Sequence, residues 1–220
     1  FHGCWHPIFF ISLIINFFYR KKIILHSHGM LSEASFKSKF FYKKIMWYLY
    51  QKKILNISEK IIVSSKKEYF EVRKLIFFKR KISVIPNGII YKDFKNFFIH
   101  NLKDKKIIKC FFFSRVHKQK GIEELIKSWS LIKHPKLRLT LFGSGDALYE
   151  KYLKDLVSKN KNKKNITISF QKKIKKNKIY QKNSILILPT YSESFGLVIL
   201  EALFSGNIVI TSKFTPWNFL

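Results

Sequence analysis

The stretch from residue 189 to 206 carries the strongest chemical signal in the sequence. Two carboxylates, Glu193 and Glu201, are separated by seven residues and bracket a polar loop and an apolar helix. The helix is expected from about residue 196 to 204, and Gly206 is placed to end it. Backbone N–H groups at a helix start bind anions, while a carboxylate on each side accepts hydrogen bonds from hydroxyls. The stretch therefore predicts a site for a phosphate joined to a hydroxyl-rich group, such as a nucleotide-sugar.

Glu201 is unusual because its neighbours in the phrase LVILEALF are almost all apolar. A carboxylate is costly to bury without hydrogen-bonding partners, so a buried Glu201 predicts a polar role, whereas the alternative is that it points to solvent. Over a helical path Glu193 and Glu201 lie at most about 12 Å apart. They are therefore expected to contact two parts of one ligand, and not to share a proton.

Two cations and a glycine-rich turn follow predicted strands in the same half of the chain. Arg115 and Lys120 flank a loop that ends at Gly121 and a helix start, which is a suitable cradle for a diphosphate. The alternative for Lys120 is a solvated charge in a lysine-rich protein. Residues 143–145, Gly-Ser-Gly, form a tight turn that is either a plain connection or part of the same site.

His28 is a candidate ligand-facing residue in the first half of the chain. It follows a short predicted strand, residues 23–27, and precedes Gly29, which allows close approach of the backbone. The alternative is a core histidine whose hydrogen bonds are satisfied internally.

The elements that position these residues alternate along the chain. Strands are expected at 23–27, 59–63, 82–85, 107–113, 137–142, 166–170, 185–188 and 207–211, and helices at 5–19, 38–57, 65–77, 121–133, 146–158, 175–181 and 196–204. Alternation of this kind predicts an α/β fold with doubly wound parallel sheets. Such sheets bind ligands at the carboxyl ends of their strands, which is where the candidate residues fall.

Two local patterns make sharper structural predictions. The helix at 38–57 is expected because residues recur at three- and four-residue spacing with lysines on the other side, which predicts one mainly apolar face. The recurring residues are Phe41, Ile45, Tyr48, Leu49, Lys52 and Leu55. Ser65 and Glu68 have capping-box spacing and predict a helix N-terminus.

The polar and lysine-rich segment 91–106 separates two predicted domains, residues 1–90 and 107–220. The sequence begins at Phe1 inside an apolar phrase and stops soon after a Pro-Trp pair. Both domains are therefore expected to be incomplete, and the chain is expected to be a fragment of a longer protein.

The chain carries a formal charge of +30, from 43 basic and 13 acidic residues. Only five basic residues are arginine, and lysine, isoleucine, phenylalanine and asparagine are all abundant, which favours a composition bias over a recognition surface. Attraction to an anionic membrane and binding of nucleic acid are the alternatives.

Cys4 and Cys110 lie far apart without metal-ligand spacing, which indicates a reducing compartment. The apolar run at residues 5–19 is shorter than the ~20 residues of a membrane-spanning helix.

Taken together, these motifs resemble the group 1 (family 4) retaining glycosyltransferases of GT-B fold. The phrases that carry the resemblance, over nearly the whole chain, are HSHGMLS, VSSKKE, VIPNGI, FFFSRVHKQKG, FGSGD, LPTYSESFGLVILEAL and TPWNFL. The resemblance implies two Rossmann-like domains, of which residues 1–90 face the acceptor and residues 107–220 bind a nucleotide-sugar. The HGML and TPW phrases resemble the subgroup that builds lipopolysaccharide or other surface polysaccharide.

The resemblance also implies roles for individual residues. Glu193 and His28 resemble the catalytic-site residues that face the donor sugar, and Glu201 resembles the carboxylate that holds the ribose hydroxyls. The remaining donor-binding residues implied in this way are Arg115, Lys120, Gly143, Phe195, Gly196 and Leu197. No metal or other cofactor is implied, because protein cations stabilise the leaving diphosphate.

The implied reaction transfers a sugar, with retention of configuration, from a nucleotide-diphosphate-sugar to a lipid-linked or polysaccharide acceptor. The implied location is the cytoplasm, with peripheral contact to the anionic cytoplasmic face of the inner membrane. Two other functions stay open at this point: an epimerase of GT-B fold that acts on a nucleotide-sugar, and a basic nucleic-acid-binding module. The sequence shows no nucleic-acid recognition motif, so nucleic acid is not expected as a partner.

Overall fold

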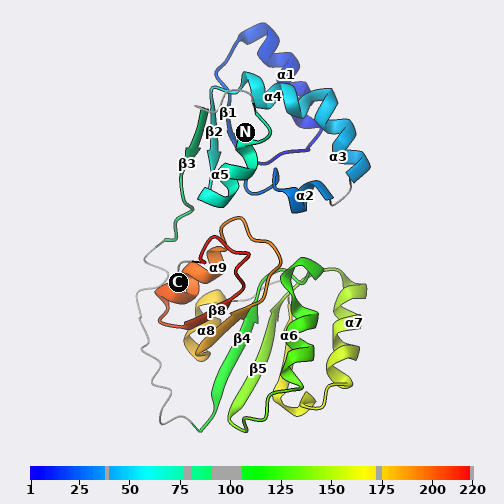
Figure 1. Ribbon diagram of the computed structural model, residues 1–220, viewed down its shortest axis with the longest axis vertical. Helices are drawn as coiled ribbons and strands as arrows, with labels where there is room; N and C mark the ends of the chain where they lie inside the picture. The colour runs from blue at the N-terminus through cyan, green and yellow to red at the C-terminus, as the bar shows by residue number, and fades with distance from the viewer. Residues whose placement is uncertain (38–39, 77–80, 91–105, 172–174, 219–220) are drawn as a thin grey trace. The chain divides into compact units, whose positions relative to one another are not determined.

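A computed structural model describes residues 1–37, 40–76, 81–90, 106–171 and 175–218 (Figure 1). The chain forms two compact units, which are described separately below. The first is built on Phe1–Asn87, and the second on Gly88–Ser192 and Gly196–Leu220. Apart from Lys106, the predicted linker at 91–106 lies outside the described residues.

The first unit contains a three-stranded parallel sheet in the order β1-β2-β3. Its strands are β1 (Ile24–His26), β2 (Lys60–Val63) and β3 (Ile82–Val84). Its helical segments are α1 (Ile8–Tyr19), α2 (Glu33–Lys37), α3 (Phe40–Met46), the π-helix η1 (Trp47–Gln51), α4 (Lys52–Ile57) and α5 (Lys66–Arg73). The side chains of Leu25, Ile61 and Val63 are fully buried and join the core of the unit. Burial of such side chains stabilises the unit by about 1.5–3 kcal/mol each.

Most of the apolar face predicted for the 38–57 helix is exposed; of its apolar residues, Leu55 is buried and Phe41, Ile45, Tyr48 and Leu49 are not. Phe41 is 81% exposed and Tyr48 is 71% exposed, whereas Tyr50 and Ile54 are buried. Phe41 and Ile45 come before the π-helical turn at Trp47–Gln51, so the turn does not explain their exposure. Its wider i→i+5 hydrogen bonding displaces later residues from the 3.6-residue spacing, although Leu55 still lies in the core. Apolar spacing alone therefore does not identify the buried residues of this segment.

The second unit contains a five-stranded parallel sheet in the order β6-β5-β4-β7-β8. Its strands are β4 (Ile108–Phe113), β5 (Leu137–Gly143), β6 (Ile166–Phe170), β7 (Ile185–Leu188) and β8 (Ile208–Thr211). Its helices are α6 (Ile122–Trp129), α7 (Ala147–Ser158), α8 (Lys176–Lys182) and α9 (Leu197–Phe204), with 3-10 turns η4 (Lys118–Lys120) and η5 (Lys163–Asn165). Helices α6 and α7 lie on one face of the sheet, and α8 and α9 on the other (Figure 1).

This doubly wound arrangement confirms the predicted α/β fold with parallel sheets. In β4, Phe111 and Phe112 are fully buried, as expected for a central strand covered by helices on both faces. On α6 the predicted apolar stripe faces the core, since Ile122, Ile126 and Trp129 are all buried. The spacing of apolar residues therefore specifies this helix correctly.

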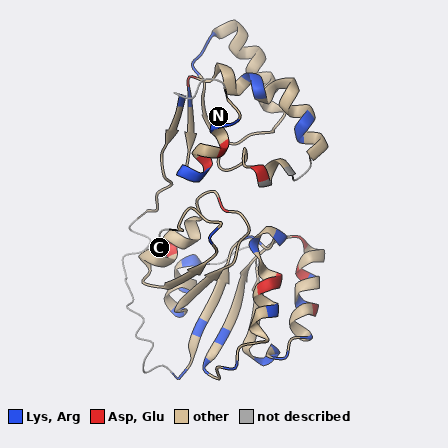
Figure 2. Ribbon diagram, in the orientation of Figure 1, with Lys and Arg blue, Asp and Glu red and all other residues tan. Residues whose placement is uncertain are grey.

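Basic residues lie on helices, strands and loops of both units (Figure 2). They are not gathered along one helix or strand of the described chain, as a nucleic-acid-binding stripe would be. Within the described residues, no helix has both the length and the apolar character needed to cross a membrane.

Candidate functional site

The loop between β4 and α6 is held against the end of β7. Gly121 has φ +67°, and a Cβ atom there would lie 2.1 Å from the carbonyl oxygen of Pro189, so a side chain does not fit. The carbonyl oxygen of Gln119 accepts hydrogen bonds from Thr190 Oγ1 at 3.1 Å and from the Tyr191 backbone N–H at 2.9 Å. These contacts fix the loop that carries Arg115 beside the connection that leads to α9.

The turn after β5 packs equally closely on the end of β4. Gly143 has φ +144°, and a Cβ atom there would lie 2.0 Å from the carbonyl oxygen of Ser114. The Val116 N–H donates to the Ser144 carbonyl oxygen at 2.9 Å, so the pairing of β4 with β5 continues into the segments that follow these strands. Only glycine fits at position 143, because the backbone of Ser114 lies too close for a Cβ atom. This close contact places Gly143 next to the loop that carries Arg115.

Helix α9 begins and ends at glycines in the left-handed region. Gly196 has φ +81° and precedes the first helical residue, Leu197. Gly206 has φ +76° and ends the helix, as the sequence predicts. At the start of α9 the Ile199 N–H donates to the Gly196 carbonyl oxygen at 2.9 Å, while the backbone N–H groups of Leu197 and Val198 precede the regular helical hydrogen bonds.

Glu201 is a buried carboxylate with two side-chain donors from α8. Its side chain is 10% exposed; Tyr180 Oη donates to Oε2 at 2.5 Å and Lys176 Nζ donates to Oε1 at 3.2 Å. Lys176 and Tyr180 lie four residues apart, so they project from one face of α8. The prediction that a buried Glu201 needs polar partners is correct.

Lys176 and Tyr180 were not identified by sequence reasoning as site residues. A signal for them was present in the sequence. Glu201 is a lone carboxylate on an apolar helix, and Lys176 and Tyr180 are two donors four residues apart on the preceding helix. Burial, and next the charge and hydrogen bond of Glu201, raise the pKa of Tyr180 well above its usual range. Tyr180 therefore remains a neutral hydrogen-bond donor to Glu201 under ordinary conditions.

A cavity of about 330 Å³ lies at the carboxyl ends of the strands of the second unit. It brings together four predicted site residues from three segments of the chain: Arg115 after β4, Gly143 at the end of β5, and Leu197 and Glu201 on α9. Lys176 also lines it. Two cations, a helix start and a carboxylate around one cavity can bind an anionic group and hydroxyls side by side.

The other predicted site residues lie elsewhere. Lys120 does not line this cavity; it is buried on the 3-10 turn η4. Glu193 and Phe195 lie on the connection between β7 and α9, and His28 follows β1 in the first unit. The roles of these four residues toward a ligand remain predictions.

The loop that carries His28 is anchored by a carboxylate from α5. Glu68 is 1% exposed and accepts four hydrogen bonds: from Ser27 Oγ at 2.6 Å, Gly29 N at 2.5 Å, and Ser64 N and Oγ at 2.8 and 2.7 Å. Ser65 Oγ accepts from the Glu68 N–H at 3.2 Å, which confirms the predicted N-cap. The Glu68 carboxylate accepts from Ser64 and from the 27–29 loop, so it ties the start of α5 to the loop that carries His28.

Three histidines near the end of β1 could hold a metal ion: His2, His26 and His28. Burial lowers the pKa of His26, and the neighbouring His28 lowers it further. Burial and then His2 likewise lower the pKa of His28, against the opposing effect of Glu68. Both imidazoles therefore favour the neutral form, in which a ring nitrogen has a free lone pair.

Two parallel α/β units, the second with a cationic cavity at the carboxyl ends of its strands, define a Rossmann-like class of ligand-binding enzymes. Residues 93–218 match the family "Glycosyl transferases group 1", and residues 2–91 match "Glycosyltransferase Family 4". The chain belongs to the group 1 glycosyl transferases.

Similar proteins agree with this assignment. A glycogen synthase of Clostridium beijerinckii is 30% identical over 155 residues, which cover 59% of this chain and 32% of that protein. The crystal structure of Anabaena HepE in complex with UDP and glucose superimposes with a TM-score of 0.76 at 18% identity, covering 95% of this chain and 57% of that one. The structure of WaaG, a glycosyltransferase involved in lipopolysaccharide biosynthesis, gives a TM-score of 0.70 at 14% identity, covering 89% and 58%.

The two structural similarities establish the GT-B fold. The chain spans about a third of the length of the curated relative and less than two thirds of the solved structures.

Proposed function

We propose that this chain is the donor-binding part of a glycosyltransferase that uses a nucleotide-diphosphate-sugar. The observation that carries the proposal is the buried Glu201 carboxylate, held by Tyr180 and Lys176 at the wall of a cavity that it shares with Arg115. A carboxylate whose two oxygens are each oriented by one donor keeps lone pairs available for a pair of neighbouring hydroxyls, such as those of ribose.

The charges around the cavity support a diphosphate in the same ligand. Arg115 and Lys176 line the cavity together with Leu197, the first residue of α9. A guanidinium and the partial positive charge of a helix start both stabilise phosphate oxygens, and they would also stabilise the charge that develops on a leaving diphosphate. HepE, which shares the fold, has been crystallised with UDP and with glucose.

The acceptor side of the proposal rests on the first unit and on sequence resemblance. We assign His28 and Glu193 to the donor sugar, and we propose transfer with retention to a lipid-linked or polysaccharide acceptor, in lipopolysaccharide or other surface polysaccharide synthesis. Lys120, Phe195 and Gly196 complete the proposed donor site. We further propose a cytoplasmic location, where the excess of 43 basic over 13 acidic residues attracts the protein to anionic lipid.

Calorimetry on the full-length protein tests the donor site, with UDP, GDP and ADP as separate probes. Glu201→Ala and Arg115→Ala should each weaken binding of the preferred nucleotide at least tenfold, since both residues line the cavity. Asp155→Ala is the matched control, because Asp155 is an exposed carboxylate on α7 paired with Lys159. Equal affinities for wild type and all three variants would disprove the ribose and diphosphate assignments.

Product analysis tests the reaction. A sugar transferred with an unchanged anomeric configuration, measured by NMR coupling constants, supports retention. Conversion of the donor to an isomerised sugar without any acceptor would instead identify an epimerase. Pelleting with vesicles tests membrane contact: equal binding to neutral and anionic vesicles would exclude the electrostatic attraction.

A further inference from the structure

The first unit contains a cluster of three histidine side chains that the proposed transfer reaction does not use as a group. His26 is the last residue of β1, and His2 pairs with it through an isolated parallel bridge. The His26 N–H donates to the carbonyl oxygen of Phe1, and the Gly3 N–H donates to that of His26, both at 2.8 Å. Bridge partners present their side chains on the same face, so the backbone pairing places these two imidazoles side by side.

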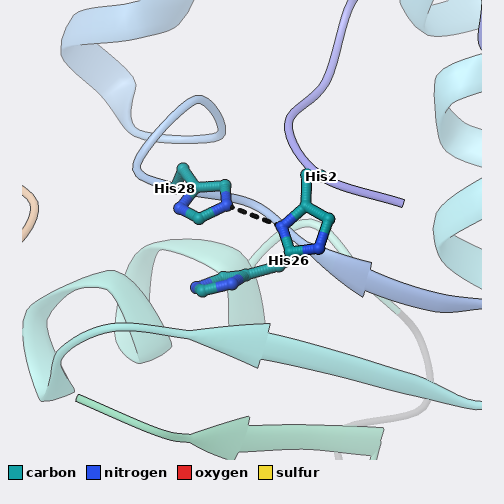
Figure 3. A group of neighbouring side chains, drawn as sticks. All are labelled: His2, His26 and His28. Carbon is teal, nitrogen blue, oxygen red and sulfur yellow. Dashed lines mark hydrogen bonds between the residues drawn. The ribbon is translucent and has the colours of Figure 1, made fainter. Parts of the chain in front are cut away.

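His28 joins the cluster because of its backbone conformation. It has φ +49°, in the left-handed region that few non-glycine residues adopt. Its ring stacks on that of His26, with ring centroids 3.7 Å apart and planes inclined by 28°. Figure 3 shows the three rings gathered at the end of β1, with Nδ1 of His2 turned toward Nε2 of His28.

We propose that His2, His26 and His28 form a binding site for a divalent transition-metal ion of the kind that imidazole prefers, such as Zn²⁺. One ligand atom from each residue lies within 4.8 Å of the other two. Nδ1 of His2 and Nε2 of His28 form a hydrogen bond at 3.1 Å, and its proton is released when a metal ion binds both nitrogens. Two nitrogens bound tetrahedrally to Zn²⁺ at about 2.0–2.1 Å lie about 3.3 Å from each other, so this pair is already at ligand spacing.

The third ligand needs only a small movement. The ligand atoms lie within 4.8 Å of one another, so a contraction of at most about 1.5 Å brings them to tetrahedral spacing, and the exposed His2 side chain has room to move by that amount. Nε2 of His26 is buried and has no hydrogen-bond partner among the described residues. An unsatisfied buried polar atom costs roughly 1–3 kcal/mol, and coordination would remove that penalty.

The surroundings of the cluster suit a metal ion better than three protonated rings. Three imidazolium groups at this spacing would repel one another, while neutral imidazole is the coordinating form. The buried Glu68 carboxylate holds the loop of His28 through Ser27 and Gly29 and adds negative charge near the cluster. Three imidazoles with a fourth position open to solvent match zinc, copper, nickel or iron sites, whereas magnesium and calcium prefer oxygen ligands.

Occupancy of the site would have a functional consequence that rests on the proposed function. His28 is predicted to face the donor sugar, so a metal ion on its Nε2 would withdraw that nitrogen from the sugar. Metal binding itself does not depend on this role and is measured without nucleotide or acceptor.

Titration of the full-length protein with Zn²⁺ in calorimetry, and with Co²⁺ in absorption spectroscopy, tests the site. We expect one ion per chain from this site and a Co²⁺ d–d spectrum of four- or five-coordinate type. His26→Ala and, independently, His2→Ala should each weaken Zn²⁺ binding at least tenfold and remove the Co²⁺ band. His134→Ala is the matched control, because His134 is an exposed histidine of the second unit, and it should leave both signals unchanged.

Melting curves recorded without metal establish that the variants are folded, and His26→Asn provides a second, more conservative test at the same position. The proposal is overturned if folded His26 and His2 variants bind Zn²⁺ as tightly as wild type. It is also overturned if wild type shows only the weak spectrum of hydrated, octahedral Co²⁺. Neither result would bear on nucleotide affinity, which the Glu201 and Arg115 variants measure separately.

Discussion

The hydrogen bond from Tyr180 to Glu201 gives a quantitative test of how the second unit supports its site. Tyr180 is fully buried, and its hydroxyl lies 2.5 Å from Glu201 Oε2. Its ring packs edge-on against Phe111 and Phe113, with centroids 5.8 and 6.0 Å away. Tyr180→Phe therefore removes the donor while it keeps the aromatic packing.

The expected effect follows from the charge of the acceptor. A hydrogen bond to a charged group contributes about 1.5–3 kcal/mol, so Tyr180→Phe should lower the free energy of unfolding by that amount. Every 1.4 kcal/mol is a factor of ten, so the unfolding equilibrium constant should rise tenfold to hundredfold. The low end applies if water from the adjoining cavity replaces the lost donor.

Urea unfolding at pH 7 measures the change, and Tyr152→Phe is the matched control. The Tyr152 hydroxyl also donates to a carboxylate, Glu123 at 3.2 Å, but Tyr152 is exposed, so Tyr152→Phe should leave the free energy of unfolding nearly unchanged. Equal, small effects of both substitutions would refute the claim that Tyr180 stabilises a buried charge.

The pH dependence of the same bond has a definite sign. Because the pKa of Tyr180 is raised on folding, its contribution is fully present below its unfolded pKa of about 10. Above that pH the unfolded chain loses the proton first, so this residue lowers stability by up to about 1.4 kcal/mol per pH unit. Tyr180→Phe should remove this part of the alkaline decline. If wild type and variant decline in parallel above pH 10, the pKa of Tyr180 is not raised.

Three further predictions concern packing and burial. Gly143→Ala should lower the melting temperature of the protein strongly, since a Cβ atom would lie 2.0 Å from the Ser114 carbonyl oxygen; an unchanged melting curve would contradict this geometry. Glu68→Gln should lower the free energy of unfolding by about 2–4 kcal/mol, because an amide NH₂ would face backbone N–H donors. Urea unfolding measures this change, and a loss below about 1 kcal/mol would mean that the hydrogen bonds to Glu68 contribute little. Burial raises the pKa of Cys4 to about 12 and of Cys110 to about 11, so neither thiol should react with iodoacetamide at pH 8 until the chain unfolds, as mass spectrometry can check; rapid alkylation of the native protein would show that the thiols are accessible.

Local patterns in the sequence account for most of the elements and their ends. The apolar runs at 108–113 and 185–188 form strands close to where they are expected, Ser65 caps α5, and Gly206 ends α9. These features depend on residues within one or two turns of each other, so secondary-structure propensity and capping rules can predict them. The seven-residue spacing of Glu193 and Glu201, together with Arg115, likewise indicates the class of ligand without any coordinates.

Tertiary structure decides which of these residues meet. Glu201 receives its donors from α8, more than twenty residues earlier in the chain, and only the packing of two helices on one face of the sheet brings them together. The same packing places Arg115 and Gly143 at one cavity but leaves Lys120 buried on a turn. Tertiary packing also decides that Tyr50 and Ile54, and not Phe41 and Tyr48, are buried in the 40–57 segment.

The histidine cluster shows most clearly the difference between what the sequence determines and what the tertiary structure determines. The sequence shows His2, His26 and His28 as separated residues, and by itself it identifies His28 alone as a candidate. The backbone bridge between His2 and His26 and the left-handed conformation of His28 create the cluster, because strand pairing and a positive φ are set by the surrounding fold. Sequence thus determines the chemistry available to this protein, while long-range packing determines which side chains can act on one ligand.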